Sequence, residues 1–365
     1  MSERSSALPY SARAEDELGR DSNQSPSTAE AICGSLHFLR SSIAHPMDHL
    51  QQSRLNLLTS HMLDRGSLVR LDTETLELRI KDRRARFIGI HKMQIAIDPA
   101  DDTLPAWLTR DEALERFGHV DPWIYLGEQN DAVYFALNLD EHGREPLDDF
   151  VGLRALAFHL DPADSTVLAY AQAMVAWHKR HRYCGRCGQS TEPRQGGHVR
   201  QCANPSCAIL HYPRTDPAII VLVEKDDKAL FGRKPEWPPH RYSTIAGFVE
   251  PGESAEQAVV REVAEETGVE VVGARYHSSQ PWPFPGSLML GYHAQAGAEL
   301  ISLNDQELEE ACWLTREEII SGLGQGIFIP PPSISISFRL IEDWFNRSSN
   351  ISLKTVLEKS DADSF

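Results

Sequence analysis

The chain has 365 residues, a hydrophobic content of 41% and a formal net charge of −17. That length allows two or more folded domains, and the hydrophobic content is typical of a globular protein. No apolar run approaches the roughly 20 residues that a membrane span needs, so we expect no association with a membrane. The acidic balance opposes long-range attraction to phosphate backbones, which argues against a bulk nucleic-acid binder. Six cysteines in a chain this long do not indicate a disulfide scaffold.

The first part of the chain has two sections of different composition. Residues 1–48 are rich in Ser, Pro and charge, which predicts a disordered N-terminal segment. Residues 49–178 predict an N-terminal α+β domain that is mostly β. Its expected strands lie in 70–80, 83–97 and 131–139, and its expected helix covers 167–181. No catalytic motif stands out here, and a scaffold or dimerisation role is the simplest interpretation.

A cysteine pattern with metal-ligand spacing follows, within residues 179–214. The pattern C-x2-C-x14-C-x4-C is formed by Cys184, Cys187, Cys202 and Cys207. Two pairs of thiolates can surround one zinc ion tetrahedrally, and closed four-cysteine sites are usually structural. We therefore predict a zinc ribbon with one structural Zn²⁺ ion per chain; free or redox-active thiols are the alternative. The segment is also basic, which fits either a solvated surface or a platform for substrate phosphates.

Residues 215–346 alternate between strands, loops and helices, which predicts an α/β/α sandwich. Within this domain, the stretch 254–267 has helical periodicity, with Ser254 as its N-cap and Gly268 as a left-handed C-cap. Three valines are expected to lie to one side of this helix and anchor it in a core: Val259, Val260 and Val263. The remaining residues, 347–365, predict a flexible tail.

Three glutamates are expected to share one face of the same helix. Because positions i, i+3 and i+4 are neighbours, the carboxylates of Glu262, Glu265 and Glu266 should lie close together and repel one another. A cation would relieve that repulsion, and oxygen ligands without His or Cys suit Mg²⁺ or Mn²⁺ better than zinc. A solvated acidic helix face is the alternative for these three residues taken alone.

A stretch rich in proline and aromatic residues lies beyond this helix. Residues 279–287 read SQPWPFPGS, with Trp282 and Phe284 set between prolines. The proline rings stiffen the backbone and hold the flat side chains at fixed angles. Taken alone, this loop fits a packing corner as well as a base-stacking site.

The residues around the acidic helix form a longer pattern with nine defined positions. From Gly247 to Val269 the chain follows G-x5-E-x7-R-E-U-x-E-E-x-G-U, in which U is an aliphatic residue. At every defined position this pattern resembles the Nudix box. The resemblance implies a Nudix hydrolase, an enzyme that cleaves a pyrophosphate.

The resemblance also implies roles for individual residues. The ligands of two or three Mg²⁺ or Mn²⁺ ions would be Ala246 (through its backbone carbonyl), Glu262, Glu265, Glu266 and Glu307. Glu309 and Glu310 lie near Glu307 and can be confused with it. Arg261 is expected to orient a box glutamate such as Glu253. Either Glu265 or Glu266 is expected to help remove a proton from the attacking water.

A second resemblance concerns the substrate. The stretch 279–287, the four-cysteine ribbon and Tyr212-Pro213-Arg214 are together similar to NADH pyrophosphatases, over residues 150–346. This similarity implies a dinucleotide pocket lined by Gln280, Pro281, Trp282, Pro283, Phe284, Pro285, Gly286 and Ser287. Further substrate contacts are expected from Arg154 in a Leu-Arg motif, from Tyr212 and from Ser337 on the closing helix.

The implied activity is metal-dependent hydrolysis of NADH, and of NAD⁺, to reduced nicotinamide mononucleotide (or NMN) and AMP. Removal of NAD caps from RNA 5′ ends is implied as a secondary activity, and a homodimer as the assembly. One alternative is a Nudix hydrolase of ADP-ribose or a diadenosine polyphosphate. Another is an RNA-binding zinc-ribbon protein with an inactive Nudix scaffold. We expect a cytoplasmic or peroxisomal location, without a clear targeting signal.

Overall fold

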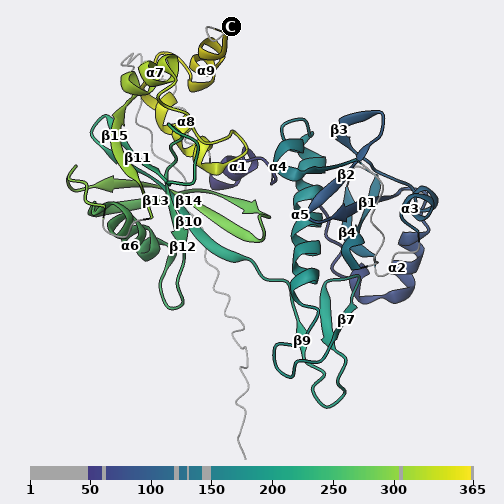
Figure 1. Cartoon of the computed structure of the whole chain (residues 1–365). Helices are drawn as coiled ribbons and strands as arrows, with labels where there is room; N and C mark the ends of the chain where they lie inside the picture. Colours follow the sequence, from purple (N-terminus) through teal and green to yellow (C-terminus); the bar gives the residue numbers. More distant parts are fainter. Residues whose placement is uncertain are drawn as a thin grey trace, which may run out of the picture. The chain divides into compact units, whose positions relative to one another are not determined.

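The computed structural model describes residues 48–59, 63–118, 123–129, 131–141, 149–303 and 307–362 (Figure 1). The segment predicted to be disordered, residues 1–48, therefore lies outside the described residues apart from Asp48. None of the described helices is both long enough and apolar enough to cross a membrane.

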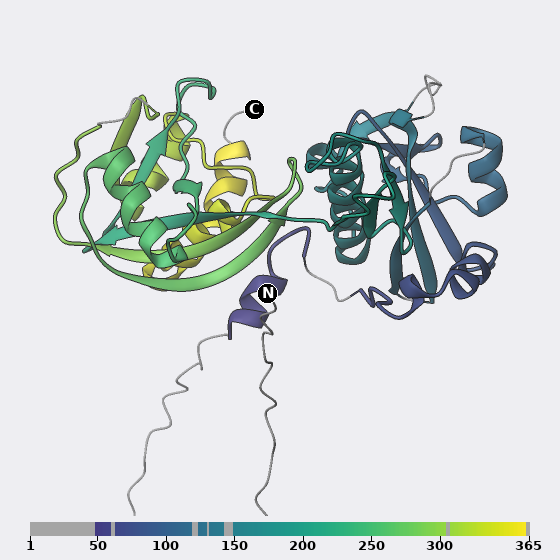
Figure 2. The same ribbon diagram turned by 90° about the horizontal axis from the view of Figure 1, so that it is seen from below.

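The N-terminal domain is built around a six-stranded sheet of order β3-β2-β1-β5-β4, with β6 paired to β2. Its strands are β1 (Ala85–His91), β2 (Gln94–Asp98), β3 (Asp101–Pro105), β4 (Ile124–Gln129), β5 (Ala132–Asn138) and β6 (Phe150–Gly152). Its helices are the 3-10 turns η1 (Val69–Leu71) and η2 (Leu139–Glu141), and α2 (Thr73–Ile80), α3 (Arg110–Phe117), α4 (Leu153–Leu156) and α5 (Pro162–Arg180). The central strands β1 and β5 run parallel. Helix α5 packs against β4 and β5 (Figure 2).

Three of the four elements predicted for this domain are confirmed. Strand β5 occupies the expected 131–139 stretch. The 83–97 stretch contains β1 and β2, separated at Lys92 and Met93, whose φ angles of 47° and 65° turn the chain. Helix α5 covers all of the expected 167–181 stretch except His181, its C-cap, and begins earlier because the Asp161 carboxylate accepts hydrogen bonds from the first turn.

The strand predicted over 70–80 is wrong, because this stretch holds η1 and α2. The Asp72 carboxylate accepts hydrogen bonds from Glu74 N and Thr75 Oγ1, which caps the first turn of α2. Leu76 and Ile80, one helical turn apart, pack on the core, whereas the alternating Leu78 is 61% exposed. The cap and the i, i+4 spacing therefore outweigh the apparent alternation.

The zinc ribbon is a three-stranded sheet of β7 (Thr191–Arg194), β8 (Val199–Cys202) and β9 (Leu210–His211). Several of its basic side chains are engaged within the chain. Arg200 is buried and donates hydrogen bonds to Thr191 Oγ1 and Thr191 O. Arg194 pairs with Glu192. These contacts reduce the charge that the ribbon can offer to substrate phosphates.

The C-terminal sandwich contains a second sheet, of order β13-β14-β10-β11-β15, with β12 also paired to β10. Its strands are β10 (Asp216–Lys225), β11 (Lys228–Arg233), β12 (Ile245–Phe248), β13 (Val271–Trp282), β14 (Ser287–Ala296) and β15 (Glu310–Thr315). Its helices are α6 (Ala255–Thr267), α7 (Arg316–Gln325), α8 (Ile336–Ser348) and α9 (Leu353–Ala362). Helices α6 and α8 lie on opposite faces of the sheet (Figure 1), as an α/β/α sandwich requires.

Strand β10 shows how the sequence creates both faces of this sandwich. Successive side chains of a strand point to opposite faces of its sheet. Ile219 and Val221 belong to the core cluster under α6, whereas Ile220 and Leu222 belong to the cluster under α7, α8 and α9. The apolar run 218–223 of this strand is therefore buried on both sides.

Both ends of the described chain differ from the predicted domain boundaries. Helix α1 (His49–Arg54), expected in the N-terminal domain, packs against β13 of the C-terminal sandwich. The tail predicted to be flexible, residues 347–365, contains α9, which packs on α7 and α8 and buries Leu353 and Val356. Apolar residues spaced one turn apart at the end of the chain explain this extra helix.

Candidate active site

Helix α6 begins and ends as its sequence predicts. The Ser254 hydroxyl accepts a hydrogen bond from Gln257 N, and the Gln257 side chain accepts one from Ser254 N, so a capping box starts the helix. Gly268 closes it with a left-handed φ of 70°. Val259 and Val263 are fully buried, but Val260 is 45% exposed and is not part of the predicted anchor.

Glycine at position 247 allows a carboxylate of α6 to approach the backbone of β12. A methyl carbon added at Gly247 would lie only 1.9 Å from Glu262 Cδ and 2.0 Å from Glu262 Oε1. No other residue type leaves that space open. The Glu262 carboxylate therefore lies directly over Gly247, next in the chain to Ala246, whose carbonyl is an expected metal ligand.

Arg261 holds the acidic residues around it in place. Its guanidinium donates hydrogen bonds to both carboxylate oxygens of Glu253, at 3.1 and 2.5 Å, as expected. It also contacts Glu262 Oε1 and Glu265 Oε2, each at 3.0 Å, and donates to Phe248 O at 2.9 Å. The hydrogen bonds from Arg261 are the largest cause that lowers the pKa of Glu253. Arg261 thus connects the loop before α6 with the acidic face of the helix.

The glutamates of this face differ in environment. Glu266 is only 2% exposed, whereas the side chain of Glu265 is 53% exposed. Burial raises the pKa of Glu262, and the negative charges of Glu265 and Glu307 act in the same direction, against the effect of Arg261. The electrostatic link to Glu307 supports its prediction as the downstream acidic residue of the site.

Lys234 is a charged residue near this site that the sequence did not indicate. It follows β11 directly, and its ammonium group donates a hydrogen bond to Glu307 Oε2 at 3.0 Å. Burial opposes its charge, but the bond to Glu307 and the charge of Glu266 raise its pKa. By contrast, Glu309 forms an ion pair with Arg233, so Glu307 and not Glu309 is the acidic residue linked to this site.

The donor set fits a hard divalent cation. The residues held together are carboxylates with one nearby backbone carbonyl, which Mg²⁺ and Mn²⁺ prefer over nitrogen or sulfur ligands. The carboxylates of this donor set lie farther apart than the ligand atoms of a preformed metal site, which all lie within 4.8 Å of one another. In the described ranges, only the four cysteines and a His277–His293–Asp343 group bring three ligand atoms within 4.8 Å of one another.

The aromatic loop lies beside the expected Leu-Arg motif. The rings of Trp282 and Phe284 meet edge to face, with centroids 4.9 Å apart. The Arg154 guanidinium lies 4.4 Å from the Phe284 centroid and 5.6 Å from that of Trp282. Cations are attracted to aromatic faces, so the exposed Arg154 is held against the two rings. We call Arg154, Trp282 and Phe284 together the aromatic unit. The structure thus brings together three residues that the sequence had assigned to substrate.

A cavity of about 460 Å³ adjoins this unit. Its lining comprises Met93, Gly152, Leu153, Arg154, Gln172, Arg180, Pro283, Phe284 and Pro285. Both Gln172 and Arg180 come from α5. Arg180 belongs to the basic segment that was considered as a phosphate platform, whereas Gln172 was not predicted. Gln172 Nε2 donates a hydrogen bond to Pro283 O at 2.7 Å, which fixes the loop against α5.

Gln280 has a different position from the one expected for a pocket-lining residue. It has no exposed surface. Its Nε2 donates hydrogen bonds to Leu57 O and Ile334 O, and its Oε1 accepts one from Ile336 N, all at 2.8 Å. The amide is therefore an internal brace that holds three backbone segments together.

Ser337 is also buried rather than open to a pocket. It is 1% exposed, and its hydroxyl lies 2.8 Å from Thr244 Oγ1 and 2.9 Å from Ser243 Oγ. These contacts join the start of α8 to the segment before β12. Tyr212 lies between β9 and β10 and is 55% exposed; within the described ranges its ring makes no aromatic contact.

The other residues of the loop are held by backbone contacts with β14 and β10. Pro281 pairs with Leu288 and Trp282 with Ser287 across β13 and β14, so Ser287 is a strand residue. The turn between them includes Pro285 and Gly286, and the carbonyl of Gly286 accepts a hydrogen bond from Asp216 N at 3.0 Å.

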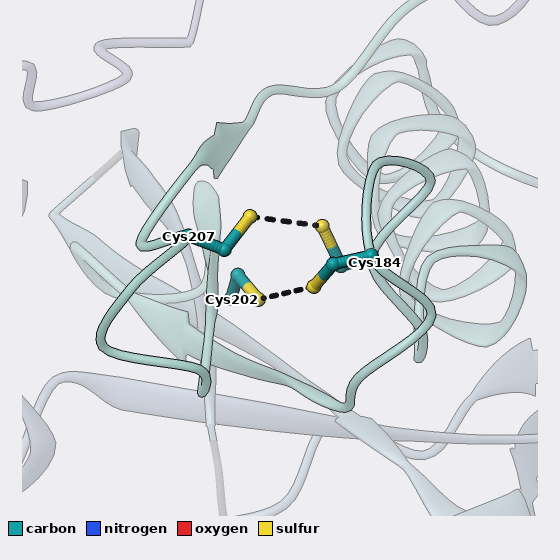
Figure 3. A group of neighbouring side chains, drawn as sticks. Cys184, Cys202 and Cys207 are labelled. Carbon is teal, nitrogen blue, oxygen red and sulfur yellow. Dashed lines mark hydrogen bonds between the residues drawn. The ribbon is translucent and has the colours of Figure 1, made fainter.

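The four cysteines converge as predicted (Figure 3). Cys187 Sγ lies 3.4 Å from Cys202 Sγ, and Cys184 Sγ lies 3.9 Å from Cys207 Sγ. A tetrahedral zinc with bonds of about 2.3 Å needs sulfur atoms about 3.8 Å apart, so the cluster fits zinc. Burial raises the pKa of Cys184, but hydrogen bonds from the Arg186 and Cys187 amides outweigh burial and lower it to about 6.

Comparison with known proteins agrees with this arrangement. The model of the NUDIX domain matches residues 213–329. That of the NADH pyrophosphatase zinc ribbon domain matches residues 179–212, and that of the NADH pyrophosphatase-like rudimentary NUDIX domain matches residues 84–177.

Curated relatives show the same similarity. NAD-capped RNA hydrolase NudC of Stutzerimonas stutzeri (strain A1501) is 40% identical over 228 residues, which cover 61% of this chain and 78% of that protein. NAD(P)H pyrophosphatase NUDT13, mitochondrial, of Homo sapiens is 38% identical over 232 residues, which cover 60% and 65%. NAD-capped RNA hydrolase NUDT12 of Homo sapiens is 40% identical over 203 residues, covering 53% of this chain but only 44% of that protein. The chain belongs to the NADH pyrophosphatase (NAD-capped RNA hydrolase) family of Nudix hydrolases, with its zinc ribbon.

Proposed function

We propose that this protein hydrolyses the pyrophosphate of NADH, and of NAD⁺, to reduced nicotinamide mononucleotide (or NMN) and AMP. The observation that carries the proposal is the acidic face of α6, which Gly247 and Arg261 hold against β12. It occurs in a chain whose relatives are named for NAD-linked pyrophosphates. The reaction adds water across one P–O–P bridge, so that the bridging oxygen leaves with one nucleotide and the water oxygen stays on the other phosphorus.

Two or three Mg²⁺ or Mn²⁺ ions are proposed at Glu262, Glu265, Glu266 and Glu307, with the carbonyl of Ala246. When bound, such ions polarise phosphoryl oxygens and lower the pKa of a water molecule. Arg261 fixes the carboxylates in advance, so that little reorganisation is needed when charge develops on the phosphates. Glu265 is open to solvent and Glu266 is buried, and one of them is proposed to accept the proton of the attacking water.

The specificity is proposed to come from the aromatic unit. Flat nicotinamide and adenine rings stack on aromatic side chains, and Trp282 and Phe284 present partly open rings beside Arg154. Arg154 and Arg180 add positive charge at the cavity, which suits a phosphorylated ligand. Gln280 and Ser337 are proposed to support this site from within, since both are buried and hydrogen-bonded.

Removal of NAD caps from RNA is proposed as a second activity, in line with the names of two relatives. One structural Zn²⁺ ion per chain is proposed in the ribbon. The family resemblance also supports a homodimer, which sedimentation equilibrium of the purified chain would test.

The function is tested by Glu266→Gln, which replaces a buried carboxylate by an amide of the same shape. Turnover of NADH should be lost while circular dichroism and zinc content stay unchanged. Glu317→Gln, an exposed glutamate of α7, is the matched control and should remain active. An active Glu266→Gln enzyme would refute the assignment.

Substrate choice is tested separately, by product analysis of NADH, NAD⁺, ADP-ribose, a diadenosine polyphosphate and NAD-capped RNA with Mg²⁺ or Mn²⁺. Preference for ADP-ribose would point to a different Nudix activity. Salt-sensitive RNA binding without hydrolysis would point to an inactive scaffold.

A further inference from the structure

A group of three metal-ligating side chains lies outside the proposed active site, between the sheet and α8 of the C-terminal sandwich. His277 comes from β13, His293 from β14 and Asp343 from α8. Their ligand atoms all lie within 4.8 Å of one another. Asp343 Oδ2 is 3.4 Å from His293 Nε2 and 4.0 Å from His277 Nε2.

An irregularity in β13 places His277 in this group. The pairing of β13 with β14 shifts from Tyr276–Tyr292 to Ser278–Gly291, which leaves His277 as the extra residue of a β-bulge. Bulges redirect a side chain and occur often beside functional sites. The rings of His277 and His293 consequently meet with centroids 5.2 Å apart.

The Nε2 atom of each histidine is buried beside the Asp343 carboxylate. His277 is 6% exposed and His293 is 4% exposed. In the described part of the chain, neither Nε2 atom makes a hydrogen bond of ordinary geometry, although each is sealed from solvent. Burying a polar atom without a partner is costly, so an ion that binds both Nε2 atoms would remove that cost.

The second nitrogen of each ring has a polar partner, which for His293 is a carboxylate. His293 Nδ1 lies 3.0 Å from Glu224 Oε1, a carboxylate oxygen that can accept the Nδ1 proton, and in that tautomer the Nε2 lone pair is available to an ion. Arg347 donates to the same Glu224 oxygen at 2.8 Å, which explains why its guanidinium also lies near the His293 ring. His277 Nδ1 contacts Ser278 Oγ at 2.7 Å. Metal-binding histidines typically donate their other N–H to a carboxylate in this way.

We propose that His277, His293 and Asp343 bind a divalent transition-metal ion, with Zn²⁺ as the probe. Two imidazoles and one carboxylate suit zinc and related ions better than Mg²⁺. Bonds of about 2.1 Å in a tetrahedral site place ligand atoms about 3.4 Å apart, which matches the 3.4 Å between Asp343 and His293, whereas His277 at 4.0 Å would have to move closer. Asp343 is the negative ligand that balances the charge of the ion, whereas beside the three ligands the charge of Glu224 is opposed by that of Arg347.

The ion would connect α8 to both strands that flank the aromatic loop. His277 lies three positions before Gln280 in β13, and Gln280 accepts the hydrogen bond from Ile336 N at the start of α8. A metal bond from Asp343 would add a second link between the same helix and the same strand. The site is therefore structural, and it supports the substrate loop without contacting the reacting phosphates.

The test is the zinc content of the purified full chain after gel filtration, measured by mass spectrometry. Two zinc ions per chain are expected, one in the ribbon and one here. Asp343→Asn, which keeps the side-chain shape, and His293→Gln should each hold one ion. The exposed His159 provides the control, and His159→Gln should hold two.

Cobalt substitution separates loss of the ion from loss of the fold. Cobalt in the four-cysteine site gives a thiolate charge-transfer band, which Asp343→Asn should retain while its total cobalt content falls by one ion. A single zinc ion in the unchanged sequence, lost with Cys202→Ser, would overturn the proposal. Two ions retained in both Asp343→Asn and His293→Gln would overturn it equally.

Discussion

A single methyl group at position 247 should separate catalysis from folding. In Gly247→Ala the new carbon would lie 1.9 Å from Glu262 Cδ, whereas carbon atoms in contact are about 3.5 Å apart or more. The Glu262 carboxylate must therefore move by about 1.6 Å or more. Since a misplacement of about 1 Å in an active site costs about 100-fold, kcat/KM should fall at least 100-fold, which corresponds to about 2.7 kcal/mol.

The stability of the same variant should change little. Gly247 is a strand residue whose φ lies outside the left-handed region, so alanine can adopt it and stabilises by about 0.4–1 kcal/mol through the unfolded chain. The displaced Glu262 loses a partly exposed ion pair with Arg261, which is worth up to about 1 kcal/mol. These contributions nearly cancel, and the Tm should stay within about 4 °C of the original.

The assay is metal-dependent hydrolysis of NADH, followed by chromatography of AMP, together with Tm from calorimetry. Gly273→Ala is the matched control in β13, because a methyl group there meets no atom within 4 Å. It should keep both activity and Tm. If Gly247→Ala retained its kcat/KM, the position of Glu262 over β12 would not matter for catalysis, and the account of the site would be refuted.

Trp282→Ala and Phe284→Ala should raise the KM for NADH more than that for a small diphosphate, because they remove stacking surfaces; equal effects would make the loop purely structural. Cys202→Ser should abolish zinc binding by the ribbon and lower the Tm, as metal analysis and calorimetry would show; unchanged zinc content would contradict the ligand set. Burial lowers the pKa of His178 and of His198 to about 4, so below pH 6.5 the unfolded chain binds protons that the folded chain does not. Unfolding free energy from denaturant titrations should therefore fall between pH 6 and 4, by about 1.4 kcal/mol per pH unit for each histidine, and a flat profile would contradict this.

Features of the active site that depend on neighbours in sequence could be predicted well. The start of α6 at Ser254 and its end at Gly268 follow from capping chemistry, and the shared face of its glutamates follows from helical periodicity. The convergence of the four cysteines follows from their spacing. Short-range rules decide each of these outcomes, so the sequence contains the necessary information.

Features that depend on distant segments could not be predicted. The brace formed by Gln280 requires Leu57 and Ile334, which are far from it in sequence. The contact of Lys234 with Glu307 joins two loops in the same way. Residues 70–80 fit both the alternation of a strand and the i, i+4 spacing of a helix. Only packing on the N-terminal core shows that Leu76 and Ile80 define the buried face. Pairings of this kind are set by the tertiary fold.

The packing of residues 48–58 on β13 changes where a functional fragment of this protein can begin. The family match to the N-terminal domain starts at residue 84, yet Asn56 Nδ2 donates hydrogen bonds to Ser278 Oγ and Ser279 O, and Leu57 O accepts one from Gln280. A chain shortened to residue 84 would leave part of the buried Gln280 amide unsatisfied, at a cost of about 1–3 kcal/mol. Residues 48–58, well ahead of the matched domain, are thus a component of the C-terminal fold. A truncation placed by domain matching alone would weaken the strand that leads into the aromatic loop.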